Sequence, residues 1–424
     1  MRKFSFIALS LALACGVSAC DRNHEPDTTP DAVLSYTPRQ TKSPKKGVAF
    51  NFEQLPDSDI PLLGPAVSWS YNWSNNHPTA KASGLYAEYG MDWCPMVWNG
   101  HYSADNIRAY KKSHPQAQYI LAFNEPNLTD QANMVPSEAA KLWPAVKALA
   151  AELDMKIISP AMNYGTLAGY HDPIKWLDEF FACEGVSLDD VDGIAVHCYM
   201  GAASAVKNYI DMFKKYGKPI WITEFCHWDG NNISEETQMS YMCETINYLE
   251  SEPAVERYAW FIPRGNYNNK VHYNLLTASS PFDLTPLGKV FVNFSTQDKS
   301  LWYKGGEVIP AEHYNAYAGQ VHCTPATDET GILDLTNLKK GHSVSYQLEL
   351  DKASEYLELR VNTYMTSKLT LLVDGESKGT YTLESTDSAW DTVKLGVVIP
   401  SGKHTLTLEG ASGAAVSLNY IVVR

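Results

Sequence analysis

QYILAF (residues 118–123) is followed by SEAAKLWPAVKALAAEL (residues 137–153) and then by KIISPA (residues 156–161). The two flanking runs are short and mostly apolar, as in strands that are buried on both faces of a parallel sheet. The longer segment predicts a helix, because Ser137 is a candidate N-cap and apolar residues follow at positions 140, 143, 148 and 151. Together they form one strand–helix–strand unit.

The same alternation extends over most of the chain. Eight apolar runs predict strands: Gly47–Phe52, Ala66–Trp69, Asp92–Trp98, Gln118–Phe123, Lys156–Ala161, Gly193–Tyr199, Pro219–Phe225 and Arg257–Ile262. Further helices are predicted at Ala202–Tyr216, Ser234–Glu252 and Thr285–Phe294. Eight such units over about 250 residues are typical of a (β/α)8 TIM barrel, here residues 47–299. A doubly wound open sheet is the alternative, but no Gly-rich phosphate loop follows the first run.

The pattern changes near Ser300, where helical segments stop. Apolar residues then recur with a period of two, for example at Ser343–Leu350, Tyr356–Asn362 and Val416–Val423, and turns such as Asp374-Gly375 separate the runs. This pattern predicts that residues 300–424 form an all-β sandwich of the jelly-roll type.

Composition excludes several classes of function. The 424 residues carry 34 Lys and Arg against 48 Asp and Glu, a formal net charge of -14, so there is no basic excess to neutralise nucleic-acid phosphates. Hydrophobic residues make up 45% and charged residues 19%, which allows a large core and excludes wholesale disorder. The 11 Trp and 25 Tyr are an excess of rings that suit the apolar faces of sugars.

The N-terminus reads as an export signal. Arg2 and Lys3 precede an apolar stretch too short to span a membrane, and Val17-Ser18-Ala19-Cys20 resembles a bacterial lipobox. Cys20 is then the predicted lipidation site, and residues 1–20 the signal peptide. Residues 21–46 are rich in Pro, Thr, Asp and Lys and predict a flexible linker. We therefore expect an exported lipoprotein anchored in the envelope membrane.

Two carboxylates stand at predicted strand ends, where barrel enzymes place their chemistry. Glu125 ends the fourth run in Asn124-Glu125-Pro126, and Glu224 ends the seventh in Thr223-Glu224-Phe225. A charged group after buried strand residues is costly unless it is used or paired, and the sequence offers no nearby basic partner except Lys218. Cleavage of a glycosidic bond requires one protonated and one ionised carboxyl.

Other polar and aromatic side chains stand at strand ends or in the loops that follow. Asn124 can contact the sugar 2-hydroxyl, and His197 and Tyr199 share one face of the sixth strand. Candidate substrate contacts are Asn124, His197, Tyr199, Trp260, Trp98, Asn99, Tyr71, Trp73 and Trp228. Trp260 is the candidate platform beneath the sugar. The cysteine spacing fits no zinc pattern, and we expect no cofactor.

The order of these motifs resembles glycoside hydrolase family 128 over about residues 46–295. The resemblance rests on Gly47-Val-Ala-Phe-Asn-Phe52, Tyr71-Asn-Trp73, Trp98-Asn99, Ala122-Phe-Asn-Glu-Pro-Asn127, His197-Cys-Tyr199, Trp221-Ile-Thr-Glu-Phe225, Asn274-Leu-Leu276 and Leu284-Thr-Pro-Leu-Gly288. It implies an endo-acting β-1,3-glucanase of the retaining (β/α)8 clan. By the same resemblance, Glu125 takes the acid/base position and Glu224 the nucleophile position.

The C-terminal region resembles carbohydrate-binding module family 6. The resemblance rests on the opening Val308-Ile-Pro-Ala-Glu-His-Tyr314 and the closing Leu418-Asn-Tyr-Ile-Val-Val423. His313 replaces the Asp of the family's opening run. By the resemblance, a structural calcium would be held by the opening Glu312 and a closing Asp, but the closing stretch here has Asn419, which argues against calcium at Glu312. Candidate ligand contacts in this region are Tyr364, Trp390 and Asn419.

These observations lead to one hypothesis and two alternatives. The hypothesis is a retaining endo-β-1,3-glucanase of laminarin-type glucan, with carboxyl carbons about 5–5.5 Å apart. The same carboxylates could serve a β-1,4- or mixed-linkage glucanase, a mannanase or a xylanase. A non-catalytic glycan-binding surface lipoprotein is the third possibility, although a pure binder has no need of either carboxylate.

Overall fold

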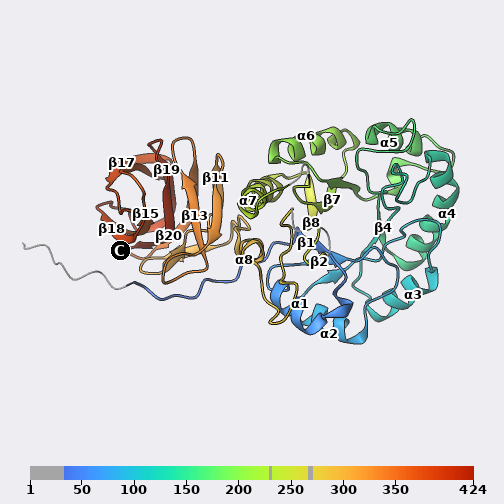
Figure 1. The fold of residues 1–424 in the computed structure, drawn as a ribbon, viewed down its shortest axis with the longest axis horizontal. Coiled ribbons are helices and arrows are strands. Elements are labelled where there is room, and N and C mark those ends of the chain that lie inside the picture. Colours follow the sequence, from blue (N-terminus) through green and yellow to red (C-terminus); the bar gives the residue numbers. More distant parts are fainter. Residues whose placement is uncertain (1–32, 229–231, 266–270) are drawn as a thin grey trace, which may run out of the picture. The chain divides into compact units, whose positions relative to one another are not determined.

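The computed structural model describes residues 33–228, 232–265 and 271–424. Figure 1 shows an α/β region, in which helices lie outside a set of parallel strands, and a C-terminal all-β region. None of the helices in these ranges combines the length and the apolar character of a membrane span. The predicted signal peptide and Cys20 lie outside the described residues.

The α/β region alternates strands and helices in the predicted order. Its strands are β1 (Lys46–Ala49), β2 (Trp69–Tyr71), β3 (Asp92–Trp93), β4 (Tyr119–Leu121), β5 (Lys156–Ile158), β6 (Ile194–Cys198), β7 (Ile220–Phe225) and β8 (Val255–Trp260). Its helices are α1 (Pro56–Leu63), α2 (Ala80–Glu88), α3 (Ala104–Ser113), α4 (Pro136–Leu153), α5 (Pro173–Phe181), α6 (Ala203–Phe213), α7 (Glu235–Ser251) and α8 (Pro286–Asn293).

Several boundaries differ from the prediction by a few residues, and local contacts explain two of the differences. The second strand was expected at Ala66–Trp69 but begins at Trp69, where its backbone pairs with Gly47 of β1. Helix α4 begins at Pro136, not after Ser137, because proline suits the first helical turn and the Glu138 carboxylate accepts the Val135 N–H at 3.1 Å. Ser234 and Thr285, the first residues of two predicted helices, lie at the N-caps of α7 and α8, where their side chains accept backbone N–H groups of the first turn.

The strands pair in parallel. Six of them form one sheet in the order β3-β2-β1-β8-β7-β6, and β4 pairs with β5. Isolated parallel bridges join Met96 to Leu121 and Ile158 to Gly193, and thus connect the β4–β5 pair with the segment after β3 on one side and with the start of β6 on the other. The carboxyl ends of all these strands therefore face the same way.

A core of large side chains fills the space between the strands. Trp69, Tyr71 and Trp221 are almost fully buried there, with the Trp69 and Trp221 ring centroids 5.3 Å apart. Gly47 is required beside them, because a Cβ at this position would lie 2.4 Å from Nε1 of Trp69. The guanidinium of Arg257 lies 4.9 Å from the Trp221 ring centroid. These side chains fill the interior of the strand layer, and the polar groups of the site lie beyond them, at the strand ends.

The all-β region contains two six-stranded sheets. One runs β12-β13-β20-β15-β18 with β10 beside β20, and the other runs β11-β14-β19-β16-β17 with β9 beside β14. Their bounds are β9 (Trp302–Lys304), β10 (Val308–Pro310), β11 (Ala316–Ala318), β12 (His322–Pro325), β13 (Leu333–Leu338), β14 (Ser343–Leu350), β15 (Leu357–Asn362), β16 (Ser367–Val373), β17 (Glu376–Leu383), β18 (Trp390–Leu395), β19 (Gly402–Gly410) and β20 (Val416–Val423). Alternate residues of β14 are buried, as the period of two predicts.

Residues 33–45 precede β1 without a helix or strand but make specific contacts. The Tyr36 ring packs edge-on against Tyr420 of β20, with centroids 5.8 Å apart. Arg39 forms an ion pair of 2.8 Å with Glu307, and Lys45 Nζ donates to the last carbonyls of α7, including Leu249 O at 3.1 Å. The described part of the predicted linker is thus held by both regions, which its polar composition did not predict.

Candidate active site

A cavity of about 590 Å³ opens at the carboxyl ends of the parallel strands. Both predicted carboxylates, Glu125 and Glu224, line it. The other lining residues are Trp73, Trp98, Asn124, Leu128, Asp130, Gln131, Asn163, Tyr199, Trp228, Phe261 and Ile262. No Lys or Arg is among these described lining residues, so the two carboxylates depend on neutral hydrogen-bond donors and on histidine.

Glu224, on β7, is 4% exposed and receives donors on both carboxylate oxygens. Tyr71 Oη and Trp73 Nε1 donate to Oε1 at 2.8 and 2.7 Å, and Tyr199 Oη donates to Oε2. Burial and the charge of Glu224 hold the pKa of Tyr71 and of Tyr199 well above the ordinary value, so both hydroxyls stay protonated. A carboxyl group that accepts hydrogen bonds on both oxygens is fixed in orientation.

Glu125 follows β4 in an unusual backbone conformation, with φ of 43°. It is 6% exposed, and its Oε1 accepts from Asn163 Nδ2 at 3.0 Å and from His197 Nδ1 at 2.8 Å. Burial raises the pKa of Glu125, but the positive charge that His197 carries when it is protonated and the hydrogen bonds of His197 and Asn163 outweigh burial and lower it. No described residue donates to Oε2, which leaves that oxygen to the cavity.

His197 of β6 joins the two carboxyls. Its Nδ1 lies 2.8 Å from Glu125 Oε1 and 3.4 Å from Glu224 Oε2, and its side chain is fully buried. Tyr199 lies two residues on and also reaches Glu224, as expected for side chains on one face of a strand. His197 and Tyr71 therefore contact the carboxylates and are absent from the cavity wall.

Asn124 precedes Glu125 and presents an unsatisfied acceptor. Its Nδ2 donates to Gln131 Oε1 at 3.1 Å, while its buried Oδ1 has no hydrogen-bond partner among the described residues. Leaving a buried amide oxygen unpaired costs free energy that a ligand hydroxyl can recover. Asn124, predicted as a sugar contact, thus lines the cavity and carries a buried, unpaired acceptor.

Aromatic rings form the cavity wall, but one prediction is wrong. Trp260 does not reach the cavity: it is fully buried, its Nε1 donates to Tyr273 O at 2.8 Å, and its ring packs on Phe225. Its neighbour Phe261 lines the cavity, because successive strand residues point to opposite faces. Trp73, Trp98, Trp228 and Tyr199 line the wall as predicted.

Several residues that line the cavity were not predicted from the sequence. Asn163 lies beyond β5 and could have been found by reading the fifth strand end as the fourth and seventh were read. Gln131 and Asp130 follow β4 in a loop with no distinctive pattern. Asn99, which was predicted, is not a lining residue, and its Oδ1 accepts the His101 N–H at 2.8 Å.

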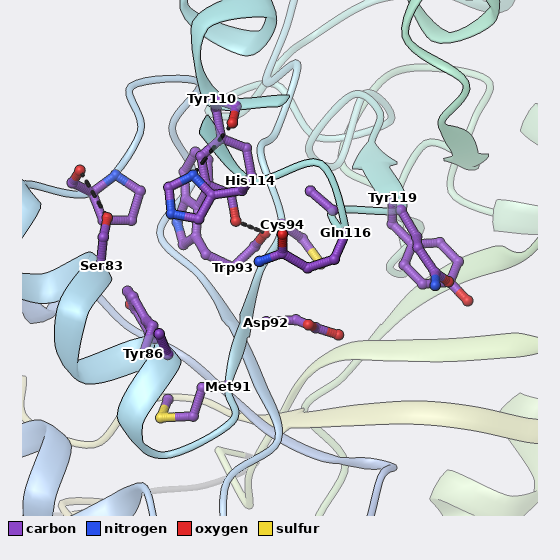
Figure 2. A pocket seen from close by; sticks show the side chains of 14 residues that line it. Ser83, Tyr86, Met91, Asp92, Trp93, Cys94, Tyr110, His114, Gln116 and Tyr119 are labelled. Carbon is purple, nitrogen blue, oxygen red and sulfur yellow. Dashed lines mark hydrogen bonds between the residues drawn. The ribbon is translucent and has the colours of Figure 1, made fainter. Parts of the chain in front are cut away.

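A second cavity lies among α2, β3, α3 and the segment before β4 (Figure 2). Its volume is about 40 Å³, enough for a water molecule or two and far too small for a sugar ring. Tyr110 Oη, at its wall, donates to Trp93 O at 3.0 Å. We assign it no chemistry.

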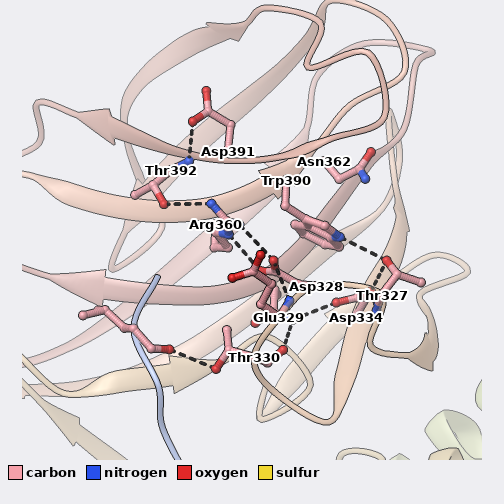
Figure 3. Close-up of polar contacts among 12 residues, drawn as sticks. Thr327, Asp328, Glu329, Thr330, Asp334, Arg360, Asn362, Trp390, Asp391 and Thr392 are labelled. Atoms are coloured by element: carbon pink, nitrogen blue, oxygen red, sulfur yellow. Dashed lines mark hydrogen bonds and ion pairs between the residues drawn. The ribbon is translucent and has the colours of Figure 1, made fainter. Parts of the chain in front are cut away.

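The three candidate ligand contacts of the all-β region differ in exposure. Tyr364 is 77% exposed beside Met365, and Trp390 is partly exposed with its Nε1 donating to Thr327 Oγ1 at 3.0 Å (Figure 3). Asn419 is buried: its Nδ2 donates to Asp334 Oδ1 at 2.8 Å and to Thr330 O at 3.0 Å. This corrects the prediction for Asn419, which has a structural role.

The side chains that commonly bind metals do not cluster. Among the described residues, no group of three or more His, Cys, Asp or Glu could hold a metal ion. Glu312 is buried and has neither oxygen hydrogen-bonded in the described part of the chain, and burial raises its pKa to about 8.

Two buried carboxyls with unequal surroundings, one on each side of an aromatic-walled cavity, are the equipment of a glycoside hydrolase. The protein is such an enzyme. Its residues 47–291, more than half of the chain, match the family described as glycosyl hydrolase catalytic core, and the chain belongs to that family.

Solved structures and one curated relative are similar to this chain. A GH128 (subgroup II) endo-β-1,3-glucanase from Pseudomonas viridiflava is 37% identical with a TM-score of 0.54, over 59% of this chain and 98% of that one. The corresponding subgroup II enzyme from Sorangium cellulosum is 34% identical with a TM-score of 0.50, over 58% and 97%. The similarity to these two structures supports membership of this chain in the GH128 family.

The curated relative is alkali-sensitive linkage protein 1 of Schizosaccharomyces pombe. It is 27% identical over 265 residues, which are 59% of this chain and 45% of the relative. The match thus spans less than half of the relative's length.

Proposed function

We propose that this protein hydrolyses internal bonds of β-1,3-glucan with retention of anomeric configuration. The observation that carries the proposal is the convergence of Glu125 and Glu224 on one cavity, bridged by His197 at 2.8 and 3.4 Å. The names of the two similar GH128 enzymes support the linkage and the endo mode. The aromatic rings of the cavity wall and the unpaired amide oxygen of Asn124 support a carbohydrate substrate.

The bridge by His197 is compatible with retention. The two oxygens that His197 contacts are at most about 6 Å apart, which agrees with the close pair of carboxyls, about 5–5.5 Å apart, that a retaining enzyme needs. We also infer that the eight parallel strands close into a (β/α)8 barrel, as the two isolated bridges beside the β4–β5 pair suggest.

In the first step Glu224, ionised and held on both oxygens, attacks the anomeric carbon. Glu125 donates a proton from the oxygen that faces the cavity to the departing glycosidic oxygen, and a glycosyl ester forms on Glu224. In the second step Glu125, now ionised, takes a proton from water, which attacks the anomeric carbon and releases Glu224. Asn124 Oδ1 accepts a hydrogen bond from a sugar hydroxyl in both steps.

We propose that the all-β region is a glycan-binding module related to carbohydrate-binding module family 6. Tyr364 at 77% exposure and Met365 at 56% form an apolar surface at the end of β15, near the start of β18 where Trp390 lies. Exposed aromatic side chains of this kind suit the face of a sugar ring.

We also propose that the protein is an exported lipoprotein, anchored through Cys20 at the envelope membrane. The proposal rests on the lipobox sequence alone. A lipid anchor would place the enzyme where large polysaccharides can reach it.

Substitution of the two carboxyls tests the catalytic assignment. Glu224→Gln should lower the rate of laminarin cleavage at least about a thousandfold, because the nucleophile is lost. Glu125→Ala should lose comparable activity on laminarin, and azide should restore turnover of an activated aryl glucoside, with a β-glycosyl azide as product. NMR of the first product anomer and sizing of products from laminarin, curdlan, barley glucan and mannan complete the test. An α-anomer first, or preferred cleavage of mannan, would refute the proposal.

Asn163→Leu tests the environment of Glu125. The Asn163 hydrogen bond stabilises the ionised carboxylate, so its loss should raise the pKa of Glu125. Because the acid must be protonated, activity falls as pH rises through this pKa, and the alkaline limb of kcat/KM should move to higher pH. A hydrogen bond worth about 1 kcal/mol corresponds to a shift of less than one pH unit. Tyr164→Phe is the control and should leave the profile in place; a shift to lower pH in Asn163→Leu would contradict the assignment.

Tyr364→Ala tests the second binding surface. In affinity electrophoresis through laminarin, the variant should lose about tenfold in affinity while its activity on short soluble oligosaccharides stays unchanged. Val398→Ala removes another exposed apolar side chain of the same region, 65% exposed, and should have no effect. Equal retardation of all three proteins would show that Tyr364 binds no glucan.

Cys20→Ser tests the anchor. In a bacterial host, the wild-type chain should incorporate labelled palmitate and partition into detergent, and the variant should do neither. Labelling of the variant would place the lipid elsewhere or refute the lipobox.

A further inference from the structure

His197 occupies a place where a single N–H can serve two carboxyls. It is fully buried, and Nδ1 lies 2.8 Å from Glu125 Oε1 and 3.4 Å from Glu224 Oε2. The shorter distance is an ordinary hydrogen bond, and the longer one needs only a small movement of the ring or carboxyl to become one. Glu125 follows β4 and Glu224 lies on β7, so the bridge joins the segment after β4 to β7.

The surroundings of the two ring nitrogens select the tautomer. Without a proton, Nδ1 would direct its lone pair at two carboxyl oxygens, which is unfavourable. Nδ1 therefore carries the proton. The other nitrogen, Nε2, is buried without a hydrogen-bond partner in the described part of the chain. A proton on Nε2 would be a buried, unpaired N–H of a cation, which is costlier than an unpaired lone pair. These contacts favour a neutral imidazole.

The charge of the site agrees with this tautomer during turnover. The ionisable groups around His197 are Glu125 and Glu224, with the neutral hydroxyls of Tyr71 and Tyr199 on Glu224. Burial lowers the pKa of His197, and the two carboxylates together more than reverse this. In each chemical step only one carboxyl is ionised, because the other is a protonated acid or an ester. An imidazolium at His197 would then be stabilised by one carboxylate instead of two.

We propose that His197 is a neutral N–H donor shared by Glu125 and Glu224, and that its hydrogen bond passes between them as the negative charge moves. The proposal rests on the double displacement described above. Before the first step the charge is on Glu224, and after it the charge is on Glu125. His197 transfers no proton at any point; it is a positioning residue that stabilises whichever carboxylate is ionised.

The side-chain geometry of amides provides the test. The Asn amide nitrogen lies near the position of Nδ1, whereas the Gln amide reaches toward Nε2. His197→Asn should therefore keep kcat on laminarin within about tenfold of wild type and keep the bell-shaped pH profile. His197→Gln and His197→Ala should lose about a hundredfold or more, the usual cost of one preorganised donor. With a dinitrophenyl laminaribioside, whose leaving group needs no acid, the burst and the steady-state rates should both fall in His197→Ala.

The opposite result is equally definite. If folded His197→Asn is as inactive as His197→Ala, while wild type cleaves laminarin with retention, the imidazole acts as a base and the proposal is wrong. A second measurement needs no turnover: ¹⁵N NMR of histidine-labelled Glu125→Gln and Glu224→Gln, with His197 assigned from the Asn variant, should show a neutral ring protonated on Nδ1. An imidazolium or the Nε2–H tautomer would overturn the proposal whatever substrate the enzyme cleaves.

Discussion

Two carboxyl groups buried at one cavity without a lining cation are the constraint on which the rest of the site depends. Glu125 and Glu224 are 6% and 4% exposed, and no described lining residue is Lys or Arg. Burying one such charge is expensive, and burying two close together is more so. The structure meets this cost with neutral donors and one histidine. These groups lower the energy of a carboxylate without the permanent positive charge that would keep both carboxyls ionised.

Parallel strands supply these groups from separate parts of the chain. Tyr71 belongs to β2, His197 to β6 and Glu224 to β7, while Asn163 follows β5. The strands share one direction, so their carboxyl ends bring the side chains together although the residues are far apart in sequence. The buried side chains packed around Trp221 hold the strands in place relative to one another. The positions of the donors are therefore set by backbone pairing and core packing, and require little ordering when substrate binds.

The sequence predicted the parts of this arrangement that follow from periodicity. Apolar runs and helix signals located every strand of the α/β region, and the strand-end rule located Glu125 and Glu224. The sequence did not show which of two neighbouring residues faces the cavity, because successive residues of a strand point to opposite faces. Trp260 was predicted to line the cavity, but its neighbour Phe261 does so. Asn419 was misjudged because its partner Asp334 is 85 positions away along the chain. Contacts of that kind have no local signal.

The unequal treatment of the two carboxyls supports their proposed roles without reference to any relative. Glu224 accepts hydrogen bonds on both oxygens, which fixes its orientation and suits it to the proposed role of nucleophile. Glu125 is held through Oε1 alone, and its other oxygen has no described donor and is left to the cavity. A carboxyl held on one side keeps a free oxygen that can carry a proton to a leaving group and later receive one from water. The asymmetry comes from donors on or just after β2, β5 and β6, so the pairing of several strands supports the proposed division of roles between the two carboxyls.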